Sequence, residues 1–305
     1  MTNAVIGVVG GGLMGIGIAT KCALAGFRTT VVDNNRDRIA ELPRLASTIL
    51  SELIDAELIT CAQSDQALGN LHVSDELFDL TDANIAIEAI PEILSAKHQL
   101  FEKLETIMRP DAVIASNTSS FPPEALSEHM VQKERFVIAH FWNPPHVIPL
   151  VEVVPGTDTN RSVIDWLVRL LTGIRSEPVV LNAAIPGFIG NRLQFAVLRE
   201  ALHIVGTGAA TPETVDAVMK ASLGRRYGMM GPFEGADLGG LGTFLSVASH
   251  LMPQLAKGEE VLDLLREHTD KGELGITTGR GFYKWDQNRI EDLKALRRGQ
   301  LVKAK

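Results

Sequence analysis

A glycine-rich run near the start of the chain constrains the fold more than any other feature. Residues 4–9 form a short apolar run typical of a buried strand, and the glycines that follow fit the pattern GxGxxG. In a strand–turn–helix unit, Gly10 allows a tight turn, Gly12 lets the backbone approach a pyrophosphate, and Gly15 lets the helix pack on the strand. The run therefore predicts a dinucleotide site at a helix N-terminus. Its expected contact residues are Gly10, Gly12, Leu13, Met14 and Gly15.

Asp33 directly follows the next expected strand, residues 28–32. A carboxylate at this place accepts a hydrogen bond from the adenosine ribose 2′-OH and repels a 2′-phosphate, so NAD is expected rather than NADP. Further short apolar runs predict strands over residues 71–73, 83–90, 111–115, 137–139, 150–154 and 177–181. Because helical segments separate most of them, we predict an α/β fold with a Rossmann-type, doubly wound, mostly parallel sheet.

The chain beyond residue 184 carries almost no strand signal. Apolar residues recur there at helical spacing over residues 188–205, 212–223 and 239–255. We therefore predict two domains: an NAD-binding domain over residues 1–184, and an all-α domain over residues 185–305 for substrate binding and dimerisation. The apolar stripes are large for such a domain, which is consistent with a homodimer. The basic tail from residue 293 is expected to be frayed.

Composition excludes several classes of protein. The net charge is −8 and the pI is about 5.5, so neither nucleic acid nor an anionic membrane is expected as a partner. Cys22 and Cys61 belong to no His/Cys cluster, so neither a metal site nor a disulfide framework is expected. The first residues lead straight into a strand without the basic segment of a signal peptide, so a cytoplasmic location is expected.

A histidine and a glutamate lie in two apolar runs that a proline-rich turn separates. His140 ends one run and Glu152 stands inside the other, with Pro144, Pro145 and Pro149 between them. If the chain doubles back there, the buried carboxylate meets the imidazole, fixes its tautomer and makes it a general base. The alternative is a structural histidine and a glutamate that meets a surface arginine.

Polar residues also follow two of the expected strands. Residues 116–120 read Ser-Asn-Thr-Ser-Ser, and this pattern favours a helix N-cap over a set of donors that face a substrate. Glu92 and Lys97 follow the strand at 83–90, at the sheet edge where open α/β sheets bind ligands.

Taken in order, these features resemble the 3-hydroxyacyl-CoA dehydrogenase family. The likeness continues through residues 186–192, 231–234 and 278–283, so it covers nearly the whole chain. The resemblance implies an NAD-dependent dehydrogenase that acts on a CH–OH group, with His140 as the general base and Glu152 as the residue that orients it. It also implies that Ser119 and Asn191 contact the reacting oxygen. The further cofactor contacts that it implies are Glu92, Lys97, Asn117, Ser119 and Asn143.

The resemblance leaves the substrate open. The activity most often found in the family is oxidation of a 3-hydroxyacyl-CoA in fatty acid metabolism, and we take it as the first expectation. However, the segment between Arg44 and Lys97 holds ten acidic residues and no Lys or Arg, and we call it the acidic arm. The matching helices of acyl-CoA enzymes are rich in lysine and face the CoA phosphates. The acidic arm and the Pro-Pro-His sequence at residues 144–146 instead favour a small CoA-free hydroxy acid, or a hydroxymethyl or formyl aromatic acid. A non-catalytic NAD-binding structural protein is a further alternative.

Overall fold

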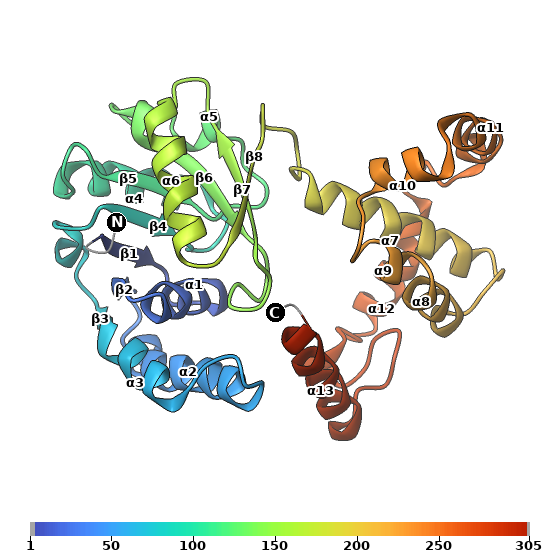
Figure 1. Cartoon of the computed structure of the whole chain (residues 1–305), viewed down its shortest axis with the longest axis horizontal. Coiled ribbons are helices and arrows are strands. Elements are labelled where there is room, and N and C mark those ends of the chain that lie inside the picture. Colours follow the sequence, from blue (N-terminus) through green and yellow to red (C-terminus); the bar gives the residue numbers. More distant parts are fainter. Residues whose placement is uncertain (1–3, 304–305) are drawn as a thin grey trace. The chain divides into compact units, whose positions relative to one another are not determined.

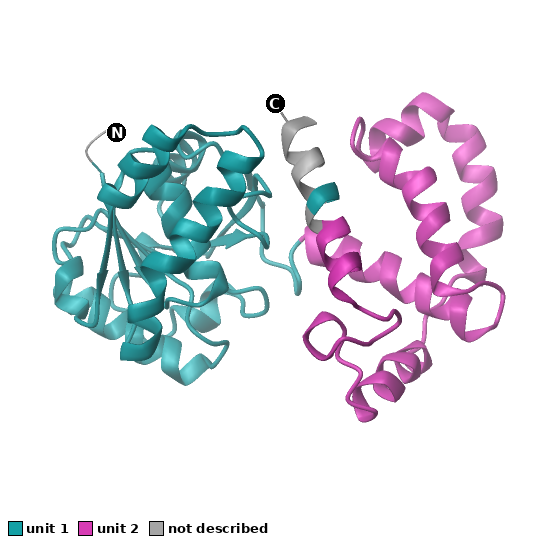
Figure 2. Cartoon of the chain, turned by 90° about the horizontal axis from the view of Figure 1, so that it is seen from below, with its two compact units in different colours: residues 1–188, 295–305 teal, residues 189–294 magenta. Residues whose placement is uncertain are grey.

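The computed structural model describes residues 4–303, with side chains for residues 4–293, 295 and 296. The chain divides into two compact units, shown in Figure 2. Unit 1 comprises Met1–Phe188 and Ala295–Lys305, and unit 2 comprises Ile189–Lys294.

Unit 1 is built on one eight-stranded sheet with the order β3-β2-β1-β4-β5-β6-β7-β8. The strands are β1 Val5–Val9, β2 Arg28–Val32, β3 Leu71–Ser74, β4 Ile85–Glu88, β5 Val113–Ser116, β6 Phe136–Phe141, β7 Leu150–Pro155 and β8 Glu177–Val180. All neighbouring pairs are parallel except β6 and β7, which are antiparallel. The order of β3 to β6 is that of a doubly wound Rossmann sheet, which confirms the predicted fold class.

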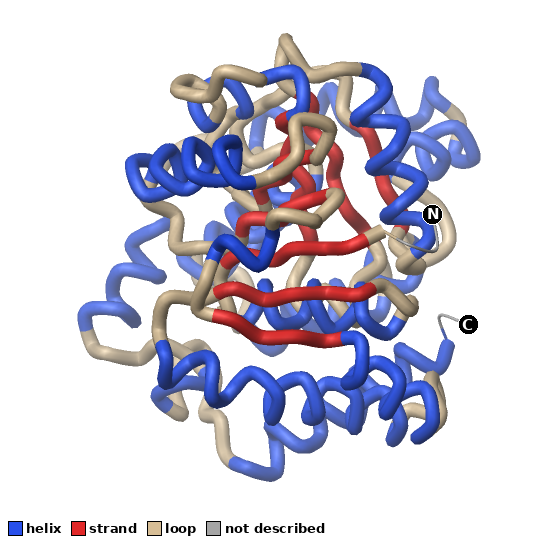
Figure 3. Tube along the Cα trace, turned by 90° about the vertical axis from the view of Figure 1, so that its left-hand side faces the viewer, coloured by secondary structure: helices blue, strands red, loops and turns tan. Residues whose placement is uncertain are grey.

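Helices cover both faces of this sheet (Figures 1 and 3). They are α1 Leu13–Leu24, α2 Arg36–Asp55, α3 Cys61–Asn70, α4 Leu94–Ile107, α5 Pro123–Leu126 and α6 Arg161–Gly173, with short 3₁₀ turns η1 Leu77–Leu80 and η2 Lys133–Arg135. Successive strand side chains point to opposite faces. Val8 thus packs with α1, α2 and α6, whereas Val9 packs with α4 and α5. The strands between the edge strands β3 and β8 are buried on both sides, which explains why they read as continuous apolar runs.

Unit 2 is helical, and its core is small. Its elements are α7 Gly190–Gly206, α8 Pro212–Ala221, α9 Leu223–Arg226, α10 Pro232–Gly239, α11 Leu241–Leu251, η3 Met252–Gln254, η4 Glu260–Leu262, α12 Asp263–Asp270 and η5 Ile276–Thr278. A last helix, α13 Gln287–Lys303, begins in unit 2 and belongs to unit 1 from Ala295 onward. The buried apolar cluster of unit 2 consists of Leu202, Ala256 and Val261. In the described part of the chain, no helix is long and apolar enough to span a membrane.

The tail from residue 293, expected to be frayed, is helical as far as Lys303 because α13 runs through it, and residues 304–305 lie outside the described residues. The start of this helix is held by contacts that charge and composition do not reveal. Asp286 accepts a hydrogen bond from the Arg289 amide at 2.9 Å. The Arg289 guanidinium lies 4.0 Å from the centre of the Tyr283 ring.

Candidate active site

The glycine-rich loop has the geometry that a bound pyrophosphate requires. Gly10 has a φ of +103°, and a Cβ there would lie 2.6 Å from the Ala89 carbonyl oxygen. A Cβ on Gly15 would lie 1.8 Å from the Gly10 carbonyl oxygen, so only glycine lets α1 pack this closely. At Gly12 a Cβ would meet no atom within 4 Å, so this stretch of backbone is open to a ligand. The loop leads into the first turn of α1, whose N–H groups favour phosphate. The conformation of this loop and the start of α1 are therefore compatible with NAD binding.

Asp33 is tied to the same loop. Its Oδ2 accepts a hydrogen bond from the Gly11 amide at 2.6 Å, and its Oδ1 accepts one from the Asn35 amide at 2.9 Å. The carboxylate therefore fixes the end of β2 against the glycine loop, in addition to the ribose contact that the sequence predicts. Gly11 was missed by the sequence analysis, because its role depends on an amide proton and not on a missing side chain. Leu13 and Met14 open α1, and the Leu13 side chain is mostly exposed.

His140 and Glu152 meet across the antiparallel pair β6–β7. They are register partners, and His140 Nδ1 lies 2.9 Å from Glu152 Oε2. Both residues are buried, with 6% and 1% of their surface exposed, so the carboxylate acts on the imidazole without screening by water. A carboxylate accepts, so Nδ1 carries the proton in this bond and the neutral ring keeps its lone pair on Nε2. The predicted contact is present.

Neighbouring groups hold this pair in place. Trp142 Nε1 donates a second hydrogen bond to Glu152 Oε2 at 3.3 Å. The ring of Phe188 lies 5.3 Å from the His140 ring, centre to centre. Asn117 Oδ1 accepts from the Phe141 amide at 2.9 Å, so the end of β5 fixes the strand position next to His140. Asn117 keeps its side-chain N–H groups as donors for a ligand.

A buried carboxylate that the sequence analysis did not single out lies beside the glycine loop. Glu88 ends β4 and is fully buried. Its Oε1 accepts from Lys97 Nζ at 2.6 Å and from the Ile90 amide at 2.8 Å, and its Oε2 accepts from Ser116 Oγ at 2.5 Å. Burial raises the pKa of Glu88, while Lys97 and Ser116 oppose that shift. The available signal was an acid inside an apolar strand, the same signal that identified Glu152.

Glu92 joins this network and organises the loop after β5. Its Oε1 accepts from the hydroxyls of Thr118 and Ser120, and its Oε2 lies 3.0 Å from Lys97 Nζ. Burial acts to raise the pKa of Glu92, but the hydrogen bonds from Ser120, Thr118 and Lys97 outweigh it, so the pKa is lowered. Lys97 is itself buried between the two carboxylates.

The helix N-cap favoured for residues 116–120 is wrong. The next helix, α5, has Pro122 at its N-cap and no side-chain capping bond. The hydroxyls of the loop instead reach acids 26 to 28 residues away in the sequence. Ser119 stands exposed in the same loop.

The loop between β6 and β7 is anchored on α1 and α2. Pro145 packs on Gly17 so closely that a Cβ there would lie 2.6 Å from the ring, and its carbonyl accepts from Lys21 Nζ at 3.1 Å. Burial lowers the pKa of Lys21 to about 8. His146 Nε2 lies 3.8 Å from Glu52 Oε2, so the Pro-Pro-His turn contacts the acidic arm. Asn143 is exposed at the start of this loop, where its peptide bond to Pro144 is cis.

The structure thus brings most of the predicted residues to one edge of the unit 1 sheet. The glycine loop follows β1, Asp33 follows β2, Glu92 and Lys97 follow β4, and Asn117 follows β5. Asn191 is half-buried in the first turn of α7 and belongs to unit 2.

Comparison with known proteins gives a family match for each unit. The family model described as the NAD-binding domain of 3-hydroxyacyl-CoA dehydrogenase matches residues 5–184, and the model of the C-terminal domain of the same family matches residues 187–285.

Individual relatives differ in substrate. The 5-formyl-3-hydroxy-2-methylpyridine 4-carboxylate 5-dehydrogenase of Mesorhizobium japonicum is 30% identical over 298 residues, which is 97% of this chain and 96% of the relative. A crystal structure of such a 5-dehydrogenase, described as an NAD⁺-dependent dismutase, superposes with a TM-score of 0.89 at 29% identity and covers 99% of this chain and 97% of its own. The (S)-3-hydroxybutyryl-CoA dehydrogenase structure from Ralstonia eutropha has a TM-score of 0.76 at 32% identity, and the match covers 93% of this chain and 100% of that one.

Proposed function

The chain belongs to the 3-hydroxyacyl-CoA dehydrogenase family and is an NAD-dependent dehydrogenase; from that membership we propose that His140 is the general base of its reaction. The observation that carries this proposal is the buried contact of 2.9 Å between His140 Nδ1 and Glu152 Oε2. Because that bond holds the proton on Nδ1, Nε2 is the atom that takes the proton from a substrate hydroxyl. NAD⁺, when bound, accepts the hydride from the carbon that carries this hydroxyl.

The other predicted residues take complementary roles in this proposal. Ser119 contacts the oxygen that becomes a carbonyl, and Asn117 and Asn143 donate to the nicotinamide side of the cofactor. Asp33 binds the adenosine ribose. Glu92 holds the loop that carries Ser119, with Lys97 as its counter-ion.

The general-base role can be tested with His140→Ala and Glu152→Gln. We expect His140→Ala to lower kcat by about a hundredfold or more. Glu152→Gln is expected to lower kcat as well, and both variants should keep the NADH affinity of the wild type in a fluorescence titration. His72→Ala, at an exposed histidine of β3, is the matched control. Wild-type kcat in His140→Ala would end the assignment.

For the substrate, we propose a small CoA-free compound with a carboxylate and a hydroxymethyl, hydroxyl or formyl group. This reverses the first expectation from the sequence. The support is the acidic arm together with the higher TM-score of 0.89 for the pyridine carboxylate enzyme. CoA carries about four negative charges, and the acidic arm offers them no Lys or Arg. A 3-hydroxyacyl-CoA is the second candidate, favoured by the family models and by the Ralstonia enzyme.

Titration of free coenzyme A into the NADH-bound protein, followed by calorimetry, tests this choice. Each charge-assisted hydrogen bond to a phosphate contributes about 1.5–3 kcal/mol, so the loss of two weakens binding by roughly a hundredfold or more. We therefore expect a Kd of about 1 mM or weaker. A Kd near 10 µM would show that CoA finds cations elsewhere and would favour the second candidate.

We further propose a homodimer formed through unit 2. Its helices α10 and α11 leave large apolar side chains exposed, which a monomer rarely does over so wide an area. The most exposed of these are Phe233, Leu238, Leu241, Leu245 and Val247. Light scattering after gel filtration should give twice the chain mass of 33.0 kDa. Phe233→Glu should shift the protein to a monomer, whereas Phe78→Glu, at a residue of unit 1 that is also mostly exposed, should not. A wild-type monomer would contradict the proposal.

A further inference from the structure

A cluster of side chains that can bind a metal lies in unit 1, and none of these side chains has a role in the proposed reaction. His98 belongs to α4, and Glu128 and His129 belong to the segment between α5 and η2. One ring nitrogen of each histidine and one carboxylate oxygen of Glu128 all lie within 4.8 Å of one another. Two imidazoles and a carboxylate are a donor set that Zn²⁺ takes in proteins.

A backbone carbonyl holds one nitrogen of the His98 ring. Its Nε2 lies 2.6 Å from the carbonyl oxygen of Ala125. A carbonyl only accepts, so Nε2 carries the proton and Nδ1 keeps the lone pair that a metal needs. A backbone carbonyl that fixes the second ring nitrogen is the usual support of a metal-bound histidine. The His129 ring stands edge-on to the His98 ring, with 4.5 Å between their centres.

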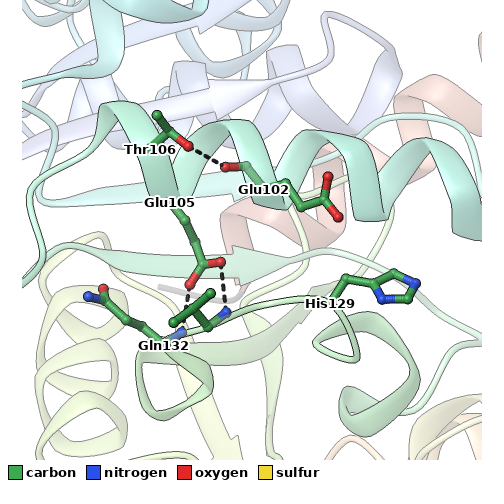
Figure 4. A pocket seen from close by; sticks show the side chains of 6 residues that line it. Glu102, Glu105, Thr106, His129 and Gln132 are labelled. Atoms are coloured by element: carbon green, nitrogen blue, oxygen red, sulfur yellow. Dashed lines mark hydrogen bonds between the residues drawn. The ribbon is translucent and has the colours of Figure 1, made fainter.

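A second carboxylate lies on the same side. Glu102 follows His98 by one helical turn on α4, so both side chains leave the same face of that helix. Glu102 and His129 line one cavity of about 400 Å³. Figure 4 shows the Glu102 carboxylate and the His129 ring on one side of the view, away from the Glu105 carboxylate, which accepts from the Val131 and Gln132 amides. Glu102 is outside the group of donor atoms that lie within 4.8 Å of one another, but its side chain is exposed, so a change of rotamer can bring its carboxylate closer as a fourth donor.

Geometry and charge both suit one transition-metal ion. Donors of one tetrahedral zinc ion lie about 3.3 Å apart, since each is about 2.0–2.1 Å from the metal. Glu102, Glu128 and His129 are exposed, so their side chains have room to close the remaining distance. Two carboxylates balance the charge of the ion, and two imidazoles select Zn²⁺ over Mg²⁺ or Ca²⁺, which prefer oxygen donors.

We propose that His98, Glu102, Glu128 and His129 form a binding site for one Zn²⁺ ion. Such an ion joins α4 to the segment after α5. Its effect is structural, because it restrains the helix that also carries Lys97, the partner of Glu88 and Glu92. The proposal does not depend on the substrate or on the general-base assignment.

Calorimetric titration of ZnSO₄ into the tag-free, EDTA-treated full chain tests the site. All proteins carry Cys61→Ser, because the exposed thiol of Cys61 is itself a zinc ligand. We expect one ion per chain and a rise in Tm on binding. His98→Ala and His129→Ala should each weaken the affinity by about tenfold or more. His72→Ala, at an exposed histidine outside the cluster, should not change it.

His129 is exposed, so its substitution leaves the fold intact and the comparison valid. Two results would overturn the proposal: a wild-type Kd weaker than about 1 mM, or an affinity that both histidine variants leave unchanged.

Discussion

Glu88 offers the most informative single substitution in unit 1. It is fully buried, and three donors point to its carboxylate: the Lys97 ammonium, the Ser116 hydroxyl and the Ile90 amide. The change Glu88→Gln keeps the shape of the side chain and removes its charge. One oxygen becomes an NH₂ group, which cannot accept from the donors that faced it.

The size of the effect follows from what Lys97 loses. Lys97 is 1% exposed, and after the substitution its remaining charged partner is Glu92, 3.0 Å away and 36% exposed on its side chain. Removing one member of a buried ion pair costs about 3–5 kcal/mol. Because the remaining amide oxygen and Glu92 still bind the ammonium, we expect the lower end, about 3 kcal/mol of unfolding free energy.

The assay is a double-mutant cycle in urea with Glu88→Gln, Lys97→Met and the double variant, followed by circular dichroism. We expect the double variant to be less destabilised than the sum of the two single changes by about 2 kcal/mol. A loss below about 1 kcal/mol in Glu88→Gln would refute the reasoning. It would mean that burial, which raises the pKa of Glu88, already keeps this carboxyl protonated in the native protein.

Three further predictions concern the cofactor, pH and thiol reactivity. Asp33→Ala should lower the ratio of NAD affinity to NADP affinity by about tenfold or more, and an unchanged ratio in NADH and NADPH titrations would remove Asp33 from the ribose site. Because the pKa of Glu92 is lowered in the native protein, its ionised carboxylate stabilises the fold at pH values above the ordinary carboxyl pKa of 4.5, and this contribution is lost as the pH falls through the native pKa. The urea midpoints of wild type and Glu92→Gln should therefore converge below pH 4.5. A difference between the midpoints that stays constant with pH would contradict this. Burial raises the pKa of Cys22 to about 12. A thiol reagent at pH 8 should therefore modify only the exposed Cys61 in the native protein, and both thiols in urea. Rapid modification of Cys22 in the native protein would show that this thiol is not buried.

Sequence reasoning succeeded where local pattern and topology decide the outcome. The contact between His140 and Glu152 could be predicted because a proline-rich turn reverses the chain between two apolar runs, and two strands joined by such a turn usually pair antiparallel. That pair places the two residues opposite each other. The roles of Gly10 and Gly15 followed from sterics, and the backbone geometry agrees with them.

It failed where a side chain finds a partner far away in the sequence. The hydroxyls of residues 116–120 looked like a helix cap because capping is the local use of such residues. Ser116 instead bonds Glu88, and Thr118 and Ser120 bond Glu92, because parallel strands bring their carboxyl ends to one edge of the sheet. Similarly, Lys97 was predicted only as a cofactor contact, and the sequence did not reveal that its ammonium lies between two carboxylates.

The most direct test of the account compares NADH oxidation by one preparation with three kinds of substrate. These are acetoacetyl-CoA, free acetoacetate and a panel of formyl-substituted pyridine and benzene carboxylates. We predict that a free carboxylate substrate exceeds acetoacetyl-CoA in kcat/KM by about tenfold or more, a difference of about 1.4 kcal/mol in transition-state binding. Turnover with the thioester alone would contradict the proposed substrate class and return the 3-hydroxyacyl-CoA to first place.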